Sequence, residues 1–496
     1  MEVVSSSKAK AIDEMSIKKI GIPGIVLMEC AAQEIYSAIL HKGENFIVCC
    51  GTGNNGGDGL AIARKLLLEG KDVTVIICGK ISSPTEEFIT NYNILSKLDA
   101  KIIVISGEDE FDDNVKNIFN YCDVIIDGIF GIGLSREIKG IYYDIIDFIN
   151  STNKYVVSID VPSGLNCDTG EVYGICIKAN ETYTIEVYKK GFFLGDSYIY
   201  LGNLNIVKIG FPKKVIDKLS DNIRILSEDY YRNMVPIRSK KAHKGDLGRV
   251  LILAGSKGYT GAAFITTEAA VRSGAGLITL AVDREIQDSL ASRLIESMTV
   301  NYDDKRIDDL IRKSDVIACG PGLGTSKESY EILKKFLKNS SCSVVLDADA
   351  LNIVSENMEL LEYIRGRGVI TPHPGEMSRL LNKSINEIEK DRIENCRKFA
   401  FKYELVVLLK GFNTVISDGK EVIINTTGNS KMASGGMGDC LTGIIASLIA
   451  QNKDLYKGTV LGCYIHGLAG DKLSESRYCI NARDIIEEVP KIMEYI

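Results

Sequence analysis

The stretch Ser434–Gly443 brings four glycines together with a single carboxylate, Asp439, and leads directly into the apolar segment Ile444–Ala450. This pattern predicts a glycine-rich turn that opens a helix. Unpaired N–H groups and the helix dipole favour an anion at such a turn, and glycine lets a ligand approach the backbone closely. An Asp at this place could deprotonate a hydroxyl beside a bound phosphate. The alternative is an ordinary helix start capped by an Asp.

The composition favours an enzyme or binding protein with more than one domain. The chain has 496 residues, of which 45% are hydrophobic and 25% charged, and its net charge is −7. Its length predicts two to four domains with substantial cores. Without a long basic run, the net acidity argues against a protein built to grip nucleic acid or an anionic membrane.

Thirteen cysteines and four histidines occur, with no Cys-x-x-Cys pair, so a zinc site is not expected. Most of the cysteines lie in apolar strand-like runs, which predicts buried, reduced thiols. The N-terminal segment lacks the apolar core of a signal peptide. The apolar run Cys440–Ala450 is too short to span a bilayer. We therefore expect a soluble cytoplasmic protein.

The first half alternates short apolar strands with helices, after a helical region Ala11–Leu40 that is broken at Gly21–Gly24. We expect a loop over Gly51–Gly59 and helices through Arg64–Leu68, at Thr90–Leu98 and at Tyr142–Asn150. Strand-helix alternation predicts an α/β fold with a doubly wound parallel sheet, whose ligand binds beyond the carboxyl ends of the strands. The expected strands are Phe46–Cys50, Val73–Cys78, Lys101–Ile105, Val124–Ile126 and Tyr155–Ile159.

Polar turns follow three of these strands. They are Gly51-Thr-Gly-Asn-Asn-Gly-Gly-Asp-Gly59, Asp127-Gly-Ile-Phe-Gly-Ile-Gly-Leu134 and the Asp160-Val-Pro-Ser-Gly-Leu165 turn. The first resembles the dinucleotide-binding G-x-G-x-x-G pattern only loosely. Three polar strand ends in one domain can nevertheless converge on a single pocket.

The charged segment Lys213–Lys241 lacks a strong strand pattern, and we place a domain boundary within it, around Leu219–Asp229. The predicted domains are residues 1–218 and 219–496. The second again alternates strands with polar turns, among them His243–Gly248, Gly255–Ala262, Gly274–Gly276, Gly320–Gly324, Asp347–Asn352, Thr371–Glu376 and Lys410–Thr414. Asp347 and Asp349 could lie near a metal, although capping the next helix explains at least one of them. Asp246 is better interpreted as a turn residue.

The three N-terminal turns, together with Ala63-Arg64 and the segment that begins at Thr184, resemble the YjeF N-terminal family of NAD(P)H-hydrate epimerases from about Ile12 to Pro212. The resemblance implies a Rossmann-like domain. It also implies a potassium ion held by Asn55, Asp127 and Ser163, and proton-transfer roles for Lys80 and Asp127. The implied hydrate-binding residues are Asn54, Asn55, Gly56, Gly57, Asp58, Gly131, Ile132, Gly133, Leu134, Ser135, Arg136, Glu137 and Asp160.

One position departs from that family. It usually reads Leu-Met-Glu-Asn-Ala, whereas this chain has Leu27-Met-Glu-Cys30-Ala. A thiol cannot replace both the donor and the acceptor of an amide. The replacement bears on the shape of the pocket and on turnover.

The C-terminal turns resemble the YjeF C-terminal family, which comprises ADP- or ATP-dependent NAD(P)H-hydrate dehydratases of the ribokinase-like superfamily, from about Arg238 onward. The resemblance implies that Asp439 is the base. It places Gly322, His373 and Asp439 against the hydrated nicotinamide and implies Mg²⁺ with ADP or ATP. His373 could equally be a structural histidine between Pro372 and Pro374, and the resemblance favours binding. The implied adenine-nucleotide residues are Lys410, Gly411, Phe412, Asn413, Thr414, Gly435, Gly436 and Gly438.

Together the two resemblances imply a homo-oligomeric repair enzyme for hydrated NADH and NADPH. The first half would interconvert the R and S hydrates, and the second would dehydrate the S form through a phosphorylated intermediate. Two alternatives stay open at this point. The second half could be a small-molecule kinase, and the first a nucleotide-binding module without catalysis. The sequence does not distinguish ADP from ATP or NADH hydrate from NADPH hydrate.

Overall fold

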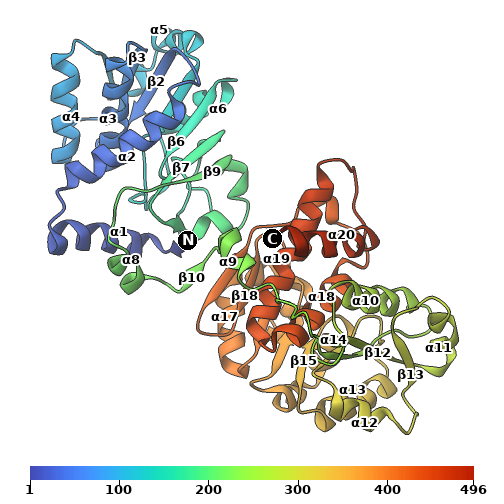
Figure 1. The fold of residues 1–496 in the computed structure, drawn as a ribbon. Helices are drawn as coiled ribbons and strands as arrows, with labels where there is room; N and C mark the ends of the chain where they lie inside the picture. The colour runs from blue at the N-terminus through green and yellow to red at the C-terminus, as the bar shows by residue number, and fades with distance from the viewer. The chain divides into compact units, whose positions relative to one another are not determined.

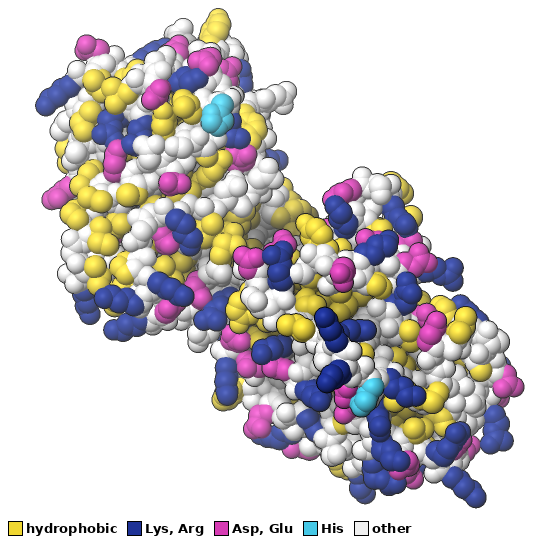
Figure 2. All heavy atoms as spheres, viewed as in Figure 1, with side chains coloured by type: hydrophobic (Ala, Val, Ile, Leu, Met, Phe, Trp, Pro, Cys, Tyr) yellow, Lys and Arg dark blue, Asp and Glu magenta, His cyan; other side chains and the backbone are white.

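The chain divides into two units, Met1–Asp221 and Asn222–Ile496, each with its own sheet (Figure 1). The structure is a computed structural model that describes all 496 residues. On the face of the molecule drawn in Figure 2, acidic and basic side chains are interspersed over both units. No helix combines the length and the apolar character that a membrane crossing requires.

The N-terminal unit is built around a seven-stranded, all-parallel sheet of order β4-β3-β2-β5-β6-β7-β9. Strands β1 and β8 pair in parallel outside this seven-stranded sheet. The strands are β1 (Glu2–Val4), β2 (Asn45–Cys50), β3 (Asp72–Cys78), β4 (Lys101–Ile105), β5 (Val124–Gly128), β6 (Tyr155–Ile159), β7 (Glu181–Ile185), β8 (Tyr188–Lys189) and β9 (Asn203–Val207). The helices are α1 (Ser6–Met15), α2 (Gly24–Ile39), α3 (Asn54–Leu68), α4 (Glu86–Lys97), α5 (Asp113–Ile118), α6 (Ile141–Ser151), α7 (Tyr198–Leu201) and α8 (Lys213–Leu219).

Successive residues of the central strand β2 point into two different cores, as strand geometry requires. Phe46, Val48 and Cys50 pack with helices α2, α3 and α4. Ile47 and Cys49 pack on the opposite face with α5 and α6. When a parallel sheet is buried on both faces, each of its strands is a continuous apolar run in the sequence. The predicted doubly wound sheet is confirmed.

The glycine-rich segment after β2 differs from the prediction. We expected a loop over Gly51–Gly59, but α3 begins at Asn54 and contains most of it. Its glycines allow close packing of this helix. A Cβ at Gly56 would overlap the carbonyl oxygen of Gly51, and one at Gly57 would press on Met28. Three residues therefore suffice to turn the chain from strand to helix.

The sheet of the C-terminal unit is parallel from β13 to β17 in the order β13-β12-β11-β14-β15-β16-β17. Antiparallel β18 and β19 extend it, and β10 pairs with β19 in parallel. The strands are β10 (Ile223–Arg224), β11 (Arg249–Leu253), β12 (Leu277–Val282), β13 (Met298–Asn301), β14 (Val316–Cys319), β15 (Ser343–Leu346), β16 (Gly368–Ile370), β17 (Val406–Leu409), β18 (Thr414–Ser417) and β19 (Val422–Asn425).

Helices cover this sheet too. Helices α10, α18, α19 and α20 share one core with alternate residues of β11 and β12, and α17 packs against β17 and β18. The helices are α9 (Glu228–Arg232), α10 (Thr260–Arg272), α11 (Arg284–Ala291), α12 (Ile307–Lys313), α13 (Lys327–Asn339), α14 (Asp349–Glu356), α15 (Pro374–Leu381), α16 (Ile385–Lys390), α17 (Arg392–Tyr403), α18 (Met437–Asn452), α19 (Leu455–Ser474) and α20 (Ala482–Tyr495). The α/β fold class predicted for this half is confirmed.

Candidate functional site

In the C-terminal unit, Asp439 lies in the first turn of α18, directly after the glycine turn that ends at Gly436. Gly436 has a φ of +87°, a conformation that favours glycine. Because no side chain caps this helix, its first N–H groups stay free for an anion. The predicted turn opening a helix is therefore confirmed.

Burial raises the pKa of Asp439 to about 6, with a further increase from the nearby Asp347 carboxylate and a decrease from Lys410. The side chain is only partly buried, so a ligand can reach it. A carboxylate with such a pKa is ionised at neutral pH and still basic enough to accept a proton.

An ion pair lies beneath the glycine turn. Lys410, at the end of β17, donates from Nζ to Oδ1 of Asp347 at 2.6 Å, and Thr442 of α18 donates to the other carboxylate oxygen at 2.7 Å. A Cβ at Gly438 would lie 3.3 Å from the Lys410 Nζ. Burial alone would raise the pKa of Asp347, but Lys410 and these hydrogen bonds lower it. Asp347 therefore stays ionised and fixes the ammonium against the turn.

Arg392 fixes the backbone at the start of the loop that follows β17. The sequence motifs predicted no role for this residue. Arg392 is 4% exposed and donates to the carbonyl oxygens of Leu409 and Lys410 at 3.1 and 2.9 Å. Asn413 has a φ of +56° and Phe412 is 63% exposed. The predicted nucleotide segment Lys410–Thr414 is thus a shaped loop that presents an aromatic ring to solvent.

His373 caps helix α15. Its Nδ1 accepts hydrogen bonds from the N–H groups of Gly375 and Glu376, and the Glu376 carboxylate accepts from the N–H of His373 in return. Burial and Lys410 lower the pKa of His373, so the ring is neutral. Because its side chain is 51% exposed, His373 can still reach a ligand. The structural and binding interpretations are compatible.

Glu376 joins the same cluster, and sequence reasoning gave it no role. Its carboxylate is buried and lies 4.0 Å from the Lys410 Nζ. Burial raises its pKa to about 7, although Lys410 opposes this shift. The sequence feature that could have identified Glu376 is its place in the strand-end motif Thr371–Glu376.

Gly322 lies in the turn that follows β14, the strand that pairs with β15. It has a φ of +62°. A Cβ there would come within 2.9 Å of the Tyr259 Cβ and 3.0 Å of the Ala262 Cβ. Asp349 accepts from the N–H of Gly324 at 2.8 Å and so holds this turn. Asp347 therefore takes part in an ion pair, and Asp349 holds a turn. Neither caps the next helix as predicted, because the N-cap of α14 is Ala348 and no side chain caps it. Asp246 accepts from the N–H of His243 in an exposed turn.

No group of three or more His, Cys, Asp or Glu side chains is arranged to hold a metal ion. Mg²⁺ usually binds through one or two carboxylates together with nucleotide phosphates and water. Glu376, whose carboxylate lies 4.0 Å from the Lys410 Nζ, is one carboxylate that could meet that limited requirement.

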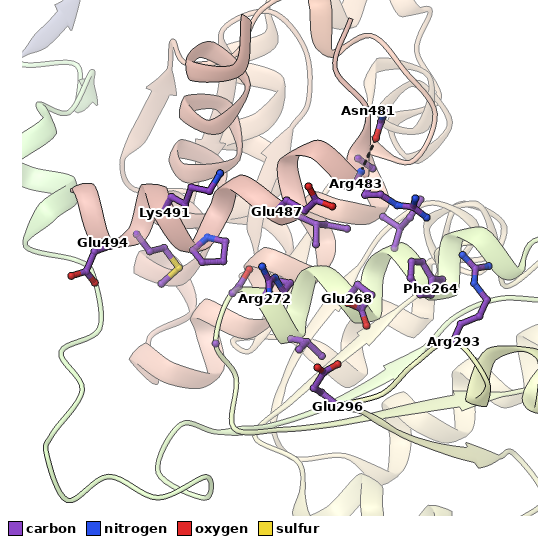
Figure 3. A pocket seen from close by; sticks show the side chains of 18 of the residues that line it. Phe264, Glu268, Arg272, Arg293, Glu296, Asn481, Arg483, Glu487, Lys491 and Glu494 are labelled. Carbon is purple, nitrogen blue, oxygen red and sulfur yellow. Dashed lines mark hydrogen bonds between the residues drawn. The ribbon is translucent and has the colours of Figure 1, made fainter. Parts of the chain in front are cut away.

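A cavity of about 1550 Å³ opens elsewhere in this unit, between α10 and α20 (Figure 3). Charges of both signs line it, such as Arg272 and Glu268 from α10 and Arg483 and Glu487 from α20. Of the predicted site residues only Gly435 lines this cavity. Asp439, Lys410, Asp347 and Glu376 do not line it.

In the N-terminal unit, the strand order brings the ends of β2, β5 and β6 side by side. Asp127, at the end of β5, is 0% exposed. One oxygen accepts from Ser163 Oγ at 2.5 Å and from the Ile129 N–H at 3.3 Å. The other accepts from Ser158 Oγ and the Ser163 N–H, both at 2.8 Å. Burial raises the pKa of Asp127, and these hydrogen bonds oppose the increase.

Oxygen atoms converge beside Asp127. Asn55 donates from Nδ2 to the carbonyl oxygen of Phe130 at 3.0 Å, which leaves its own Oδ1 free. Ser163 Oγ lies 3.2 Å from the same carbonyl oxygen. Amide, hydroxyl and carbonyl oxygens are hard ligands that suit an alkali cation, so Asn55, Asp127 and Ser163 fit K⁺.

Asp160, at the end of β6, has a φ of +62° and is ion-paired with the buried Lys189. Lys189 also donates to Thr184 Oγ1 at 2.8 Å, and the N–H of Ile185 donates to Asp160 at 2.9 Å. Sequence reasoning missed Lys189, although it belongs to the segment that carries the resemblance.

The other predicted N-terminal site residues lie on the segments that follow β2, β3 and β5. Asn54 is exposed at the start of α3, whereas Gly56, Gly57 and Asp58 are buried. The residues from Gly131 to Glu137 form a loop, mostly half-buried or exposed, after β5. Lys80 is exposed beyond β3, and its ammonium makes no ion pair or hydrogen bond. Cys30 lies apart, on α2 in a groove with Glu29, Gln33 and Lys65.

Comparison with known proteins covers both units. Residues 250–491 match a family described as NAD(P)H-hydrate dehydratase, and residues 24–191 match the YjeF-related protein N-terminus. A crystal structure of a ribokinase-like superfamily protein from Enterococcus faecalis is 32% identical, with a TM-score of 0.53. It covers 55% of this chain and 96% of that one.

Two curated relatives span nearly the whole chain. The bifunctional NAD(P)H-hydrate repair enzyme Nnr of Moorella thermoacetica is 36% identical over 99% of this chain and 97% of its own length. The enzyme of the same name from Dictyoglomus turgidum is 33% identical over 100% of this chain and 99% of its own length. This chain therefore belongs to the family of bifunctional NAD(P)H-hydrate repair enzymes.

Proposed function

We propose that the C-terminal unit dehydrates S-NAD(P)H hydrate with ADP or ATP as phosphoryl donor, and that the N-terminal unit interconverts the R and S hydrates. The observation that carries the proposal is the position of Asp439 in the first turn of α18, beside the Lys410–Asp347 pair. Nicotinamide hydrates and an adenine nucleotide are the partners, in a cytoplasmic homo-oligomer.

In the dehydratase, Asp439 takes the proton of the ring hydroxyl as that oxygen attacks the terminal phosphate. The free N–H groups at Gly435–Gly438 and the ammonium of Lys410 stabilise the negative charge that develops. Mg²⁺ bound with the nucleotide would be held by Glu376 and would neutralise phosphate charge. Gly322 and the neutral His373 hold the nicotinamide. The C–O bond then breaks, phosphate departs with the bonding electrons, and the lone pair of the ring nitrogen stabilises the carbon left behind. The neighbouring ring carbon loses a proton to the departing phosphate, and the electrons of that C–H bond re-form the double bond.

The adenine nucleotide lies along Lys410–Thr414, where Phe412 offers a face for the base, and its phosphates bind at Gly435, Gly436 and Gly438. A small-molecule kinase would use the same Asp and the same turn, so the product distinguishes the two activities. The dehydratase returns inorganic phosphate and reduced nicotinamide. A kinase would accumulate a stable phosphorylated product.

In the epimerase, Asn55, Asp127 and Ser163 would hold K⁺, which would stabilise the loop that starts at Gly131 and negative charge on the substrate. The hydrate lies over Asn54–Asp58, Gly131–Glu137 and Asp160. Lys80 is free to contact the phosphates of the dinucleotide. The buried Asp127, whose oxygens accept four hydrogen bonds, is a cation ligand and not a proton carrier.

Dehydration should depend on the ionisation of Asp439. Its pKa of about 6 means that the carboxylate form, which can accept a proton, predominates above pH 6 and is lost below it. We expect kcat for S-hydrate dehydration to rise with pH to a plateau and to fall about tenfold per unit below the midpoint. The measurement is kcat from pH 4.5 to 8 at saturating nucleotide and Mg²⁺. A rate constant that does not change over this range would contradict the role of Asp439.

Epimerisation should require K⁺. Dehydration of pure S hydrate, which needs no epimerisation, is the internal control. Replacing K⁺ by tetramethylammonium, which is too large for the oxygen cluster, should slow conversion of R to S hydrate by about tenfold or more. Asn55→Ala should abolish the K⁺ dependence and leave the slow rate. Equal epimerisation rates in both salts would show that no such cation acts.

A further inference from the structure

The buried guanidinium of Arg392 connects helix α16 to the loop where we place the adenine nucleotide. Its Nη2 donates to the carbonyl oxygens of Leu409 and Lys410 at 3.1 and 2.9 Å. Its Nη1 donates to the two carboxylate oxygens of Glu389 at 3.0 and 2.9 Å. The planar group thus joins one carboxylate to two successive carbonyls, an arrangement that the single nitrogen of a lysine cannot reproduce.

Gly411 adapts the loop to this guanidinium. It has a φ of +147°, and a Cβ at this position would overlap both terminal nitrogens of Arg392. Only glycine has the backbone freedom and the small size that such a close approach requires. The carbonyl of Gly411 accepts from Thr414 Oγ1 at 3.0 Å, so the loop also folds back on itself. The guanidinium and the glycine together set the path of the backbone.

The corner between α16 and α17 fixes the direction of the Arg392 side chain. Glu389 lies near the end of α16, and Arg392 is the first residue of α17. Asn395, which is 6% exposed, donates to the carbonyl oxygens of Glu387 and Ile388 at 3.1 and 3.3 Å. These bonds close the end of α16 against α17. Arg392 therefore projects from a corner that has its own hydrogen bonds, independent of the loop that it holds.

Both backbone polar groups of Lys410 are held. The carbonyl accepts from Arg392, and the N–H donates to the carbonyl of Pro372 at 2.9 Å. The ammonium has a separate partner, because it donates to Asp347 at 2.6 Å. Loss of the guanidinium would therefore release one side of the loop backbone and leave the ion pair beside the glycine turn in place.

The side of the site where we place the hydrate has other supports. His373 is fixed by its capping box with Glu376. The turn after β14 is fixed by Asp349, which accepts from the N–H of Gly324 at 2.8 Å. Neither support includes Arg392. A change at Arg392 should therefore act on the nucleotide and spare the hydrate.

We propose that Arg392 is a positioning residue that sets the affinity of the dehydratase for its adenine nucleotide. It acts through the carbonyls of Leu409 and Lys410 and through Gly411, not by touching the nucleotide. The proposal rests on the dehydratase function proposed above, in which the nucleotide lies along Lys410–Thr414. A loop that is already shaped before binding loses less conformational entropy when the ligand arrives, so nucleotide affinity depends on this support.

The test measures nucleotide affinity and turnover separately in the full-length protein. Arg392→Lys keeps the positive charge and loses the planar fork, so it should raise the calorimetric Kd for ADP and ATP about tenfold or more. The KM for the nucleotide should rise in parallel. The KM for S hydrate should stay within about twofold, and kcat at saturating nucleotide within about threefold, of the wild-type values.

Gly411→Ala tests the same contact from the loop side. It keeps Arg392 but removes the space for its guanidinium, so the nucleotide Kd should rise in a similar way, and this variant still decides the matter if Arg392→Lys does not fold. In the double variant, Kd should rise little beyond that of the weaker-binding single variant, because both changes break one contact. The control is Arg365→Lys, which alters an arginine paired with Glu362 and Glu404 outside the loop and should change neither Kd nor KM.

An unchanged nucleotide Kd in Arg392→Lys or in Gly411→Ala would overturn the proposal. Equal increases in the KM for the nucleotide and the KM for the hydrate would also overturn it, since they would indicate a general loss of structure. A wild type that binds ADP or ATP but does not dehydrate S hydrate would instead refute the proposed function. The Kd values would then still decide whether Arg392 positions the nucleotide loop.

Discussion

Replacing Asp439 by Asn should lower kcat for S-hydrate dehydration by about a thousandfold, as loss of a general base does. Asn has nearly the same shape but cannot accept the hydroxyl proton. Because the anion site consists of backbone N–H groups at the start of α18, the Kd for ADP or ATP should stay within a few fold of the wild type. Initial-rate assays and calorimetric titration measure the two quantities.

The matched control for this variant is Asp246→Asn. Asp246 is an exposed turn residue whose carboxylate accepts from the N–H of His243, and its replacement should leave kcat unchanged. If Asp439→Asn retained more than a tenth of the wild-type kcat, Asp439 would not be the base. If it abolished nucleotide binding as well, its role would be structural.

Replacing Lys410 by Met should have the largest effect on stability. It would leave the Asp347 carboxylate, which is 1% exposed, with only hydroxyl donors. Removing one partner of a buried ion pair costs about 3 kcal/mol, partly offset here because the Lys410 side chain is 20% exposed. The same variant should lose dehydratase activity, since the ammonium below Gly438 would be gone. Denaturant unfolding of the full-length protein, monitored in the C-terminal transition, measures the loss.

The double variant Lys410→Met, Asp347→Asn separates the two roles of the pair. It removes both charges, so most of the lost stability should return while dehydration stays impaired. Lys420→Met, which removes an exposed lysine from the turn before β19, should change neither quantity. A Lys410→Met protein as stable as the wild type would show that Asp347 does not depend on this partner.

Element positions in both units followed closely from the sequence. Strands such as Lys101–Ile105 and Val406–Leu409 agree with the structure at both ends, because short apolar runs between polar turns are typical of buried parallel strands. The start of α3 was predicted wrongly. Glycines usually indicate a turn, and only the close packing of Gly56 against Gly51 and of Gly57 against Met28 explains why they belong to a helix here.

The site was predictable where its residues belong to glycine-rich strand ends, as Asp439 and Asn55 do. Partners that are distant in sequence were not. Lys410 and Asp347 are 63 positions apart, and nothing in either motif indicates that they form an ion pair. Lys189 was missed for a similar reason. A lysine at the end of a short strand normally reaches solvent, whereas this one is buried against Asp160.

The measurement that tests the central claim most directly is incubation of the full-length protein with an equal mixture of R and S hydrates, K⁺, Mg²⁺ and ADP or ATP. Reduced nicotinamide is followed by its absorbance and both hydrates by chromatography. If the two units act in sequence, both hydrates disappear and reduced nicotinamide returns in full, with one inorganic phosphate for each molecule. Recovery that stops when the S hydrate is consumed, or accumulation of a stable phosphorylated product, would contradict the proposed function.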